Sequence, residues 1–533
     1  VITPDAEGNF TFETPDFQVG EATLTVSIDG WELKKTMRRL EPNGHTMSWI
    51  SGGKLIVDGK PVLRRNMYAT YYNGGEAFRR RYDADNLHET RYVTWKTTQP
   101  GVMIPGSQAF NASTKGETTQ DRVPSDEMLR KLDAALESYK DQDYVYNHTW
   151  DEPEYNHCSL IYMKHIYDYL CEKDPYHVVE NATHNPEWYI NFCDWMEADP
   201  YLGAMITDKG ERIYSKACNK LPSYIDSAVA MNMPNKSIGI VSTCFAYRWV
   251  DLAHDYPTFD EMIASNWVMF NHGAKTASAY AYHDMNDRPQ LYEGTRYIFA
   301  SLEALEAPIL FGERKVLLRN ENVDAALFEY GNDTFFALVN QTGETQTVTL
   351  DGISGTWHHF RHNRTFTGNT FELKPYEVLI GTRQMKDRKL PTYQQTAALI
   401  DRLEAERLSN KSLLFDRLED IEISTQAGQW TRHKLFDGVK DNLACELRGK
   451  NLFIELGLKK VAPTFDKIVV SGWHLEDMVI KVRVGEQLVT LEPAEVQAEE
   501  FSATFILNAP VSPDALRFEF PQERVELYEI EVY

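Results

Sequence analysis

Two adjacent carboxylates, Asp151 and Glu152, end a short β-prone segment and are followed directly by Pro153. A helix-like segment comes next, with apolar residues spaced close to a 3.6-residue period over 159–170. A strand, an acidic tip and a helix form the unit from which α/β barrels are built, and the C-terminal strand ends of such barrels carry the chemistry. An adjacent indole, Trp150, and the second carboxylate would raise the pKa of Glu152 toward the working pH, as a general acid requires. Glu152 is therefore the first catalytic candidate, although the two acids could also simply begin the next helix, whose N-terminus favours negative charge.

A second acidic segment has the alternation of a strand. Trp195, Glu197 and Asp199 would lie on one face of that strand, and Pro200 marks its exit. Glycoside hydrolysis needs two carboxylates in one pocket, because one protonates the leaving oxygen while the other attacks the anomeric carbon or activates water. Asp199 is the stronger partner candidate because it lies nearest the tip, with Glu197 second and Asp151 third. A polar strand end that merely caps a barrel would explain the same residues.

The other predicted strand tips carry aromatic and polar side chains, which could line a sugar subsite or could each be structural. The candidate substrate-binding residues are Tyr71, His148, Trp150, His184, Asn185, Tyr201, Tyr247, Trp249 and Tyr282. The sequence contains no His-Glu-x-x-His, no Gly-x-Ser-x-Gly and no Gly-rich phosphate loop. We therefore expect no metal ligands and no cofactor in catalysis.

Composition limits the classes of partner. Lys plus Arg is 55 and Asp plus Glu is 79, and the resulting net charge of −24 disfavours nucleic acid and anionic membrane surfaces. No apolar run approaches the roughly 20 residues that span a bilayer. The first residues do not resemble a signal peptide, so the chain is expected to be mature, truncated or cytosolic.

The order of strand-like and helix-like segments predicts the fold. Strands that alternate with helices indicate βαβ units and a parallel, TIM-like (β/α)8 barrel. The segment 72–101 has too few predicted elements for an eight-unit barrel, because it offers only the weak strand candidate Tyr92–Trp95 and no good helix. Either the barrel is irregular or residues are missing there. The predicted regions are a partial β-sandwich at 1–45, the barrel at 46–307, a small antiparallel β-sandwich at 308–385, a helical linker at 386–415 and a second β-domain at 416–533.

The barrel region resembles the clan A glycoside hydrolases. The resemblance lies in the hairpin Gly-Gly-Lys-Leu-Ile-Val-Asp-Gly-Lys-Pro at 52–61 and in Asp-Glu-Pro at 151–153, and it covers about 50–307. In these retaining (α/β)8 enzymes the mid-barrel motif is usually Asn-Glu-Pro, so the resemblance implies that Glu152 is the acid/base and that Asp151 replaces the Asn that touches the sugar 2-hydroxyl. The late strand that would carry the nucleophilic Glu corresponds to 238–247, which has no carboxylate. Three alternatives stay open: another acid takes that role, the enzyme inverts, or the protein binds sugar without cleaving it.

The last region resembles a discoidin-type (coagulation factor 5/8 type C) domain. This resemblance implies a jelly roll that binds carbohydrate in secreted bacterial enzymes, some with a structural calcium. The segments that carry it are Lys434–Gly438, Leu452–Gly457, Phe465–Gly472, Leu516–Phe520 and Tyr528–Tyr533.

Together these observations predict a secreted, periplasmic or cell-surface glycoside hydrolase. It would cleave O-glycosidic bonds in a complex oligo- or polysaccharide by carboxylate acid/base catalysis, either with retention or with inversion. The alternative is a non-catalytic glycan-binding protein on a degenerate barrel, favoured by the carboxylate-free segment at 238–247. A polysaccharide lyase or esterase is a weaker option, because no nucleophilic Ser elbow is visible.

Overall fold

The computed structural model describes residues 18–28, 30–67, 119–139, 147–155, 157–231, 233, 235–384, 390–425, 432–440 and 442–533. The chain begins, within these ranges, with an antiparallel hairpin of β1 (Gly20–Ile28) and β2 (Trp31–Arg39). A meander of β3 (Ser48–Ser51), β4 (Lys54–Val57) and β5 (Lys60–Pro61) follows. Asp58 and Gly59 connect β4 to β5 with positive φ at both positions, the conformation that an Asp-Gly dipeptide favours in a two-residue hairpin turn.

A six-stranded sheet forms the centre of the molecule, and every neighbouring pair of its strands is parallel. Of the strands in this sheet, the one that comes first in the chain pairs with the one that comes last. The same two strands are neighbours in a (β/α)8 barrel. The candidate strand Tyr92–Trp95 lies outside the described residues, so a closed barrel stays a prediction. In spatial order the strands are β6 (Arg65–Met67), β13 (Ala277–Tyr280), β12 (Ser237–Thr243), β9 (Trp195–Ala198), β8 (Val178–Thr183) and β7 (Asn147–Asp151).

Helices follow most of these strands, as the 3.6-residue periodicity predicts. The innermost, α7, begins at a capping box between Thr258 and Glu261, ends at Gly273 with a φ of 115°, and is buried along almost its whole length. Such burial fits the large apolar residues of this helix, for example Met262, Trp267 and Phe270. The helices are α3 (Asp126–Tyr139), α4 (Leu160–Lys173), α5 (Pro186–Tyr189), α6 (Ser223–Ala230), α7 (Phe259–His272), α8 (Pro289–Ala304) and α9 (Glu306–Phe311).

Several strand ends differ from the prediction. The β-prone runs at 236–247 and 275–283 are longer than the strands β12 and β13 that form there, and short 3-10 helices follow these strands: η5 (Tyr247–Trp249) and η6 (Tyr282–Asp287). After β9 the chain forms an unpredicted antiparallel ribbon of β10 (Gly203–Ile206) and β11 (Arg212–Lys216). Two further 3-10 turns, η3 (Ile190–Phe192) and η4 (Cys218–Lys220), complete this part.

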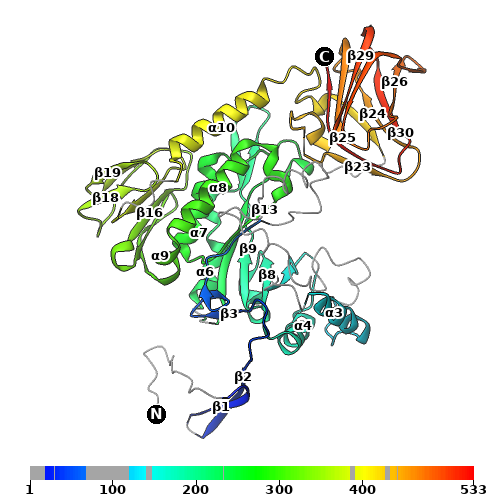
Figure 1. Ribbon diagram of the computed structural model, residues 1–533. Helices are drawn as coiled ribbons and strands as arrows, with labels where there is room; N and C mark the ends of the chain where they lie inside the picture. Colours follow the sequence, from blue (N-terminus) through cyan, green and yellow to red (C-terminus); the bar gives the residue numbers. More distant parts are fainter. Residues whose placement is uncertain are drawn as a thin grey trace.

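The rest of the chain is rich in sheet, as predicted. A six-stranded antiparallel sheet and a two-stranded sheet come first, and Figure 1 shows α10 (Tyr393–Leu408, yellow) running from them toward the last β-region. The strands of the larger sheet are β14 (Glu313–Arg319), β15 (Val323–Glu329), β16 (Phe335–Asn340), β21 (Val378–Thr382), β18 (Thr356–His359) and β19 (Arg364–Thr367), and the smaller one pairs β17 (Gln346–Thr349) with β20 (Thr370–Leu373).

Two five-stranded antiparallel sheets form the last β-region, and their inward-facing apolar residues share one core. The first contains β22 (Glu422–Thr425), β24 (Leu452–Gly457), β30 (Ala515–Phe520), β26 (Val479–Val484) and β27 (Gln487–Thr490). The second contains β23 (Cys445–Arg448), β31 (Arg524–Val532), β25 (Phe465–Trp473), β29 (Ser502–Val511) and β28 (Pro493–Glu499). This region is an antiparallel β-sandwich, while the predicted division into domains stays a prediction.

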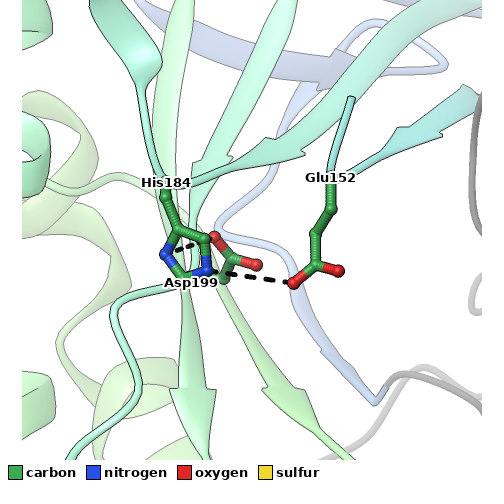
Figure 2. Close-up of side chains that lie close together, drawn as sticks. All are labelled: Glu152, His184 and Asp199. Carbon is green, nitrogen blue, oxygen red and sulfur yellow. Dashed lines mark ion pairs between the residues drawn. The ribbon is translucent and has the colours of Figure 1, made fainter. Parts of the chain in front are cut away.

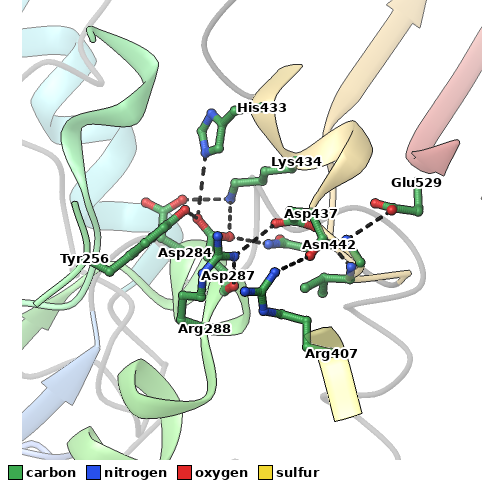
Figure 3. Close-up of polar contacts among 12 residues, drawn as sticks. Tyr256, Asp284, Asp287, Arg288, Arg407, His433, Lys434, Asp437, Asn442 and Glu529 are labelled. Carbon is green, nitrogen blue, oxygen red and sulfur yellow. Dashed lines mark hydrogen bonds and ion pairs between the residues drawn. The ribbon is translucent and has the colours of Figure 1, made fainter. Parts of the chain in front are cut away.

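A buried polar cluster, which we call the joint, connects η6 to the segment around η9 (Arg432–Phe436) at the start of this sandwich (Figure 3). Lys434 Nζ lies 2.7 Å from Asp284 Oδ1 and 3.1 Å from Asp287 Oδ1. Asp287 also accepts hydrogen bonds from Tyr256 and from Asn442. The joint therefore ties the loop after β13 to the C-terminal sandwich through the buried charges of Lys434 and Asp287.

Candidate active site

Three neighbouring parallel strands end side by side in the central sheet, and one polar residue follows each of them. Glu152 comes directly after β7, His184 after β8 and Asp199 after β9. Because the strands are in register, these residues lie at the same carboxyl edge, where barrel enzymes carry their catalytic groups.

The three side chains form one cluster, which we call the strand-end cluster (Figure 2). His184 lies between the acids, with Nε2 3.8 Å from Glu152 Oε1 and Nδ1 3.5 Å from Asp199 Oδ1. One oxygen or nitrogen atom of each residue lies within 4.8 Å of the corresponding atom of the other two. The side chains of Glu152 and His184 are about one-sixth exposed, whereas the side chain of Asp199 is 2% exposed. The sequence-based expectation that two acids from separate strand ends converge therefore describes the geometry of Glu152 and Asp199.

The backbone holds Glu152 in a conformation that L-residues seldom adopt. Its φ is +42°, and its N–H donates to the carbonyl of Ala182 at 2.9 Å. Such strained residues cluster at functional sites. The carboxylate of Glu154 accepts hydrogen bonds from Thr183 Oγ1 and from the backbone N–H of His184, so it fastens the turn after β7 to the end of β8. Glu154 therefore positions two members of the strand-end cluster at once.

The acids of this edge raise one another's pKa. Burial raises the pKa of Asp199 well above its ordinary value, and the nearby Glu152 and Asp151 raise it further. Burial, Glu152 and Glu180 raise the pKa of Asp151 to about 7. The Oδ1 atom of Asp199 is buried and has no hydrogen-bond partner among the described residues. Perturbed acids at a strand edge are typical of catalytic or metal sites.

His184 does not neutralise these acids near neutral pH. Burial, together with the positive charge of Lys216, lowers the pKa of His184 to about 4. The Lys216 ammonium itself lies 4.7 Å from the centre of the Tyr224 ring. The imidazole of His184 is therefore uncharged, with one nitrogen that donates and one that accepts.

Aromatic rings surround the cluster. The His184 ring packs edge-on against Tyr155, Tyr201 and Tyr224, with centroids 5.3, 6.4 and 5.9 Å away. Further rings extend from Tyr201, namely Phe245, Tyr247 and Tyr280. Rings beside hydrogen-bonding groups are the usual lining of a sugar subsite.

Glu197 lies elsewhere. Its carboxylate is fully buried and accepts hydrogen bonds from Thr276 Oγ1 at 3.1 Å and Ser278 Oγ at 2.6 Å, across β12. The contact between Glu197 and Thr276 needs a glycine at position 239 of β12, because a Cβ atom there would approach Thr276 Oγ1 to 1.8 Å. Burial and Glu180 raise the pKa of Glu197 to about 8. The alternation predicted for β9 holds, but among the described residues Glu197 belongs to a hydrogen-bond network inside the sheet, and Asp199 is the acid that faces Glu152.

The remaining candidate residues are distributed as follows. Asp151 is the last residue of β7, and Asn185 precedes α5 without a side-chain cap. Tyr247 lies on η5 beside the ring cluster, not on a strand tip. Tyr71 lies outside the described residues, and for the others only the backbone is described: His148 and Trp150 on β7, Trp249 on η5 and Tyr282 on η6.

Three residues of this region were not predicted from the sequence. Tyr155 and Glu154 follow the Asp-Glu-Pro turn, so their position next to Glu152 in the chain was the only indication of their place. Tyr224 lies within α6, and no periodicity or motif connects it with the strand ends.

No family model matches the chain, and no curated protein matches it. Among solved structures it is similar to CpGH89CBM32-6 produced by Clostridium perfringens, at 15% identity over 23% of this chain and 98% of the other, with a TM-score of 0.19. It is also similar to an alpha-amylase from Geobacillus thermoleovorans complexed with acarbose, at 10% identity over 50% of this chain and 65% of the other, with a TM-score of 0.34. An Anoxybacillus alpha-amylase is similar at 12% identity over 59% of this chain and 74% of the other, with a TM-score of 0.35. Identities and TM-scores this low establish neither a shared family nor a shared activity. None of the described helices is long and apolar enough to span a membrane.

Proposed function

We propose that this protein is a glycoside hydrolase that cleaves O-glycosidic bonds in an oligo- or polysaccharide, with Glu152 and Asp199 as its catalytic carboxylates. The observation that carries this proposal is the approach of the two acids from separate strand ends, with oxygens within 4.8 Å at a ring-lined edge. Retaining glycosidases hold their carboxyl groups about 5–5.5 Å apart, and inverting enzymes need about 6.5–9.5 Å to admit water. We propose retention, because one oxygen of each acid lies within 4.8 Å of an oxygen of the other.

The electrostatics support a division of roles. Burial and the neighbouring carboxylates of Glu152 and Asp151 raise the pKa of Asp199 well above its ordinary value. The raised pKa favours Asp199 as the carrier of the proton. Asp199 would then protonate the glycosidic oxygen, and ionised Glu152 would attack the anomeric carbon. This assignment differs from the acid/base role that the Asn-Glu-Pro resemblance implies for Glu152.

The neighbouring residues complete the proposed site. Tyr155 is largely exposed beside His184 and would stack against a sugar ring. The uncharged imidazole of His184 would donate one hydrogen bond and accept another, and Glu154 would keep that ring in place. Water would be excluded on the side of Tyr201 and Phe245, which are buried.

We extend the proposal to the whole architecture. The six parallel strands would belong to a complete (β/α)8 barrel, and the C-terminal sandwich would be a discoidin-type, carbohydrate-binding module. Four of the segments that carry the discoidin resemblance coincide with β24, β25, β30 and β31. A module of this kind supports a secreted, periplasmic or cell-surface location.

We also propose a structural calcium at the start of this sandwich, beside Arg288, whose Nη1 lies 3.9 Å from Asp437 Oδ2. Asp437 Oδ2 and Glu529 Oε2 have no hydrogen-bond partner within the described residues, and burial raises the pKa of both acids. Oxygen donors are what calcium prefers, and its charge would compensate the two acids. Asp437 and Glu529 would hold the ion, so adding calcium to chelator-treated protein should raise its unfolding temperature.

The second candidate function is sugar binding without cleavage. The observation that favours it is β12, which has no carboxylate and which the clan A resemblance matches to the strand that carries the nucleophile. Titration calorimetry that detects sugar affinity, together with no hydrolysis of a broad glycan panel, would support this function.

The catalytic proposal is tested by turnover on a panel of aryl glycosides and natural glycans. Glu152→Gln is expected to lose at least about 10³-fold in kcat, because a single catalytic carboxylate supplies several kcal/mol of transition-state stabilisation. Asp168→Asn, which changes an exposed carboxylate on α4, is the matched control and should retain activity. Near-normal turnover by Glu152→Gln would defeat the proposal.

The division of roles has its own test in Glu152→Ala. If Glu152 is the nucleophile, added azide should restore turnover and give a glycosyl azide of inverted anomeric configuration, because azide then attacks from the side that Glu152 occupied. A glycosyl azide of retained configuration would assign proton transfer to Glu152 instead.

A further inference from the structure

We propose that Glu152, His184 and Asp199 bind one zinc-like divalent cation, and that this cation blocks the carboxylates needed for hydrolysis. The binding part stands on the geometry of the strand-end cluster alone, whereas the inhibitory part rests on the proposed function.

The donor set suits such a cation. Two carboxylates and one imidazole are ligands that Zn²⁺ takes in three-residue sites, where a further position stays open. The donor atoms lie within 4.8 Å of one another, and they come from three adjacent strand ends rather than from one mobile loop. Zinc bonds to nitrogen and oxygen of about 2.0–2.2 Å would require only a modest contraction, through side-chain rotation.

An unsatisfied atom points into this cluster. Asp199 is 1% exposed, and its Oδ1 atom, which faces His184 at 3.5 Å, has no hydrogen-bond partner among the described residues. Buried polar atoms without partners are few in folded proteins and call for an explanation such as an ion or a water. A bound cation supplies the partner that this oxygen lacks.

The local charge also favours a cation. The charged groups that act on Asp199 are the carboxylates of Glu152, Asp151 and Glu154. Lys216 is the cation that acts on His184, and it packs against the Tyr224 ring. Grouped carboxylates attract a divalent ion.

Two of the three proposed ligands are also the proposed catalytic carboxylates, so metal binding would affect hydrolysis. A cation held by Glu152 and Asp199 would occupy both proposed catalytic oxygens, so neither acid could donate a proton or attack carbon. Zinc would thus act as a competitor of the glycan, and a chelator would restore turnover.

Zinc binding by the full-length, chelator-treated chain tests this inference by equilibrium dialysis, with Co²⁺ absorption as a second readout. We expect close to one tight Zn²⁺ per chain and at least about a tenfold loss of affinity in His184→Ala, Glu152→Gln and Asp199→Asn. The matched control is His474→Ala, which removes the exposed histidine whose Nδ1 lies 3.7 Å from Glu476 Oε2. It should keep the tight site.

The outcomes separate this inference from the proposed function. Tight zinc binding that survives His184→Ala, or no tight binding by the unaltered chain, overturns the inference whether or not glycans are cleaved. Zinc binding that depends on the three residues, in a chain that cleaves no glycan, keeps the metal site and overturns the glycosidase. Hydrolysis that zinc at saturating concentration leaves unchanged overturns the inhibitory part.

Discussion

The strand-end cluster and the joint are built from similar buried acids, but they differ in the positive charge beside them. In the joint, burial alone would raise the pKa of Asp287, but Lys434 and hydrogen bonds from His433 and Tyr256 hold it well below its usual range. At the strand ends, burial and other carboxylates raise the pKa of Asp199. Figures 2 and 3 show these two arrangements.

This difference separates a structural contact from a site prepared for chemistry. A buried acid that is paired and hydrogen-bonded contributes to the position of two regions of the chain. A buried acid that is left among like charges costs stability, and proteins retain such groups where a substrate or an ion will meet them. Removing charges from the two clusters should therefore have opposite effects on folding.

The largest expected effect on stability comes from Lys434→Met. The variant leaves Asp284 and Asp287 without their buried ammonium, which should lower the free energy of unfolding by about 3–5 kcal/mol. Urea denaturation measures this change. Lys164→Met, which breaks the exposed pair with Asp168, is the control and should cost less than about 0.5 kcal/mol. Equal losses of unfolding free energy in both variants would show that the buried ion pairs of the joint stabilise the fold no more than an exposed pair does.

The dependence of stability on pH should differ in sign between Asp287 of the joint and Asp151, which directly precedes Glu152 of the strand-end cluster. The pKa of Asp151 is raised to about 7, so between about pH 4 and 7 the native state binds more protons than the unfolded state. The stability that Asp151 contributes is therefore lost as pH rises through this window, by about 4 kcal/mol in all, and Asp151→Asn should remove that slope.

For Asp287 the pKa is lowered, so its contribution is present above the unfolded pKa and is lost as pH falls below about 4. Asp287→Asn should flatten only this acidic limb. Urea unfolding as a function of pH measures, for each variant, the slope of the unfolding free energy that the substitution removes. Removed slopes of the same sign for Asp151 and Asp287 would contradict the predicted difference.

The smallest effect is expected for Asp199→Asn at neutral pH. Because the substitution removes a buried carboxyl group whose ionisation is unfavourable, it should leave stability unchanged or raise it by about 1 kcal/mol, while hydrolysis is lost. The unfolding midpoint and turnover are measured on the same sample. A variant that unfolds more readily than the unaltered chain would indicate that Asp199 is structural.

Local sequence patterns predicted much of this fold. Apolar periodicity located α4, and β-prone runs ending in acids located the ends of β7 and β9, because each depends on residues close in the chain. The ends of β12 and β13 were less predictable. Their β-prone patterns continue past Thr243 and Tyr280, where the chain forms the 3-10 helices η5 and η6 instead.

The site itself was predictable only in part. The type and spacing of Glu152 and Asp199 pointed to a strand edge, since parallel strands expose their ends together. The place of His184 between the two acids depends on the register of β8, and the contact between Lys434 and Asp284 joins residues 150 positions apart. Such long-range contacts leave no periodic trace in one sequence.

The central claim is that Glu152 and Asp199 act as one unit, and a double-mutant cycle on turnover tests it most directly. We measure kcat/KM for Glu152→Gln, Asp199→Asn and the double variant, with thermal unfolding as the check on folding. Since residues of one catalytic unit are strongly non-additive, the double variant should lose about as much as the worse single variant. Losses that multiply, or single variants with near-normal turnover, would contradict the account.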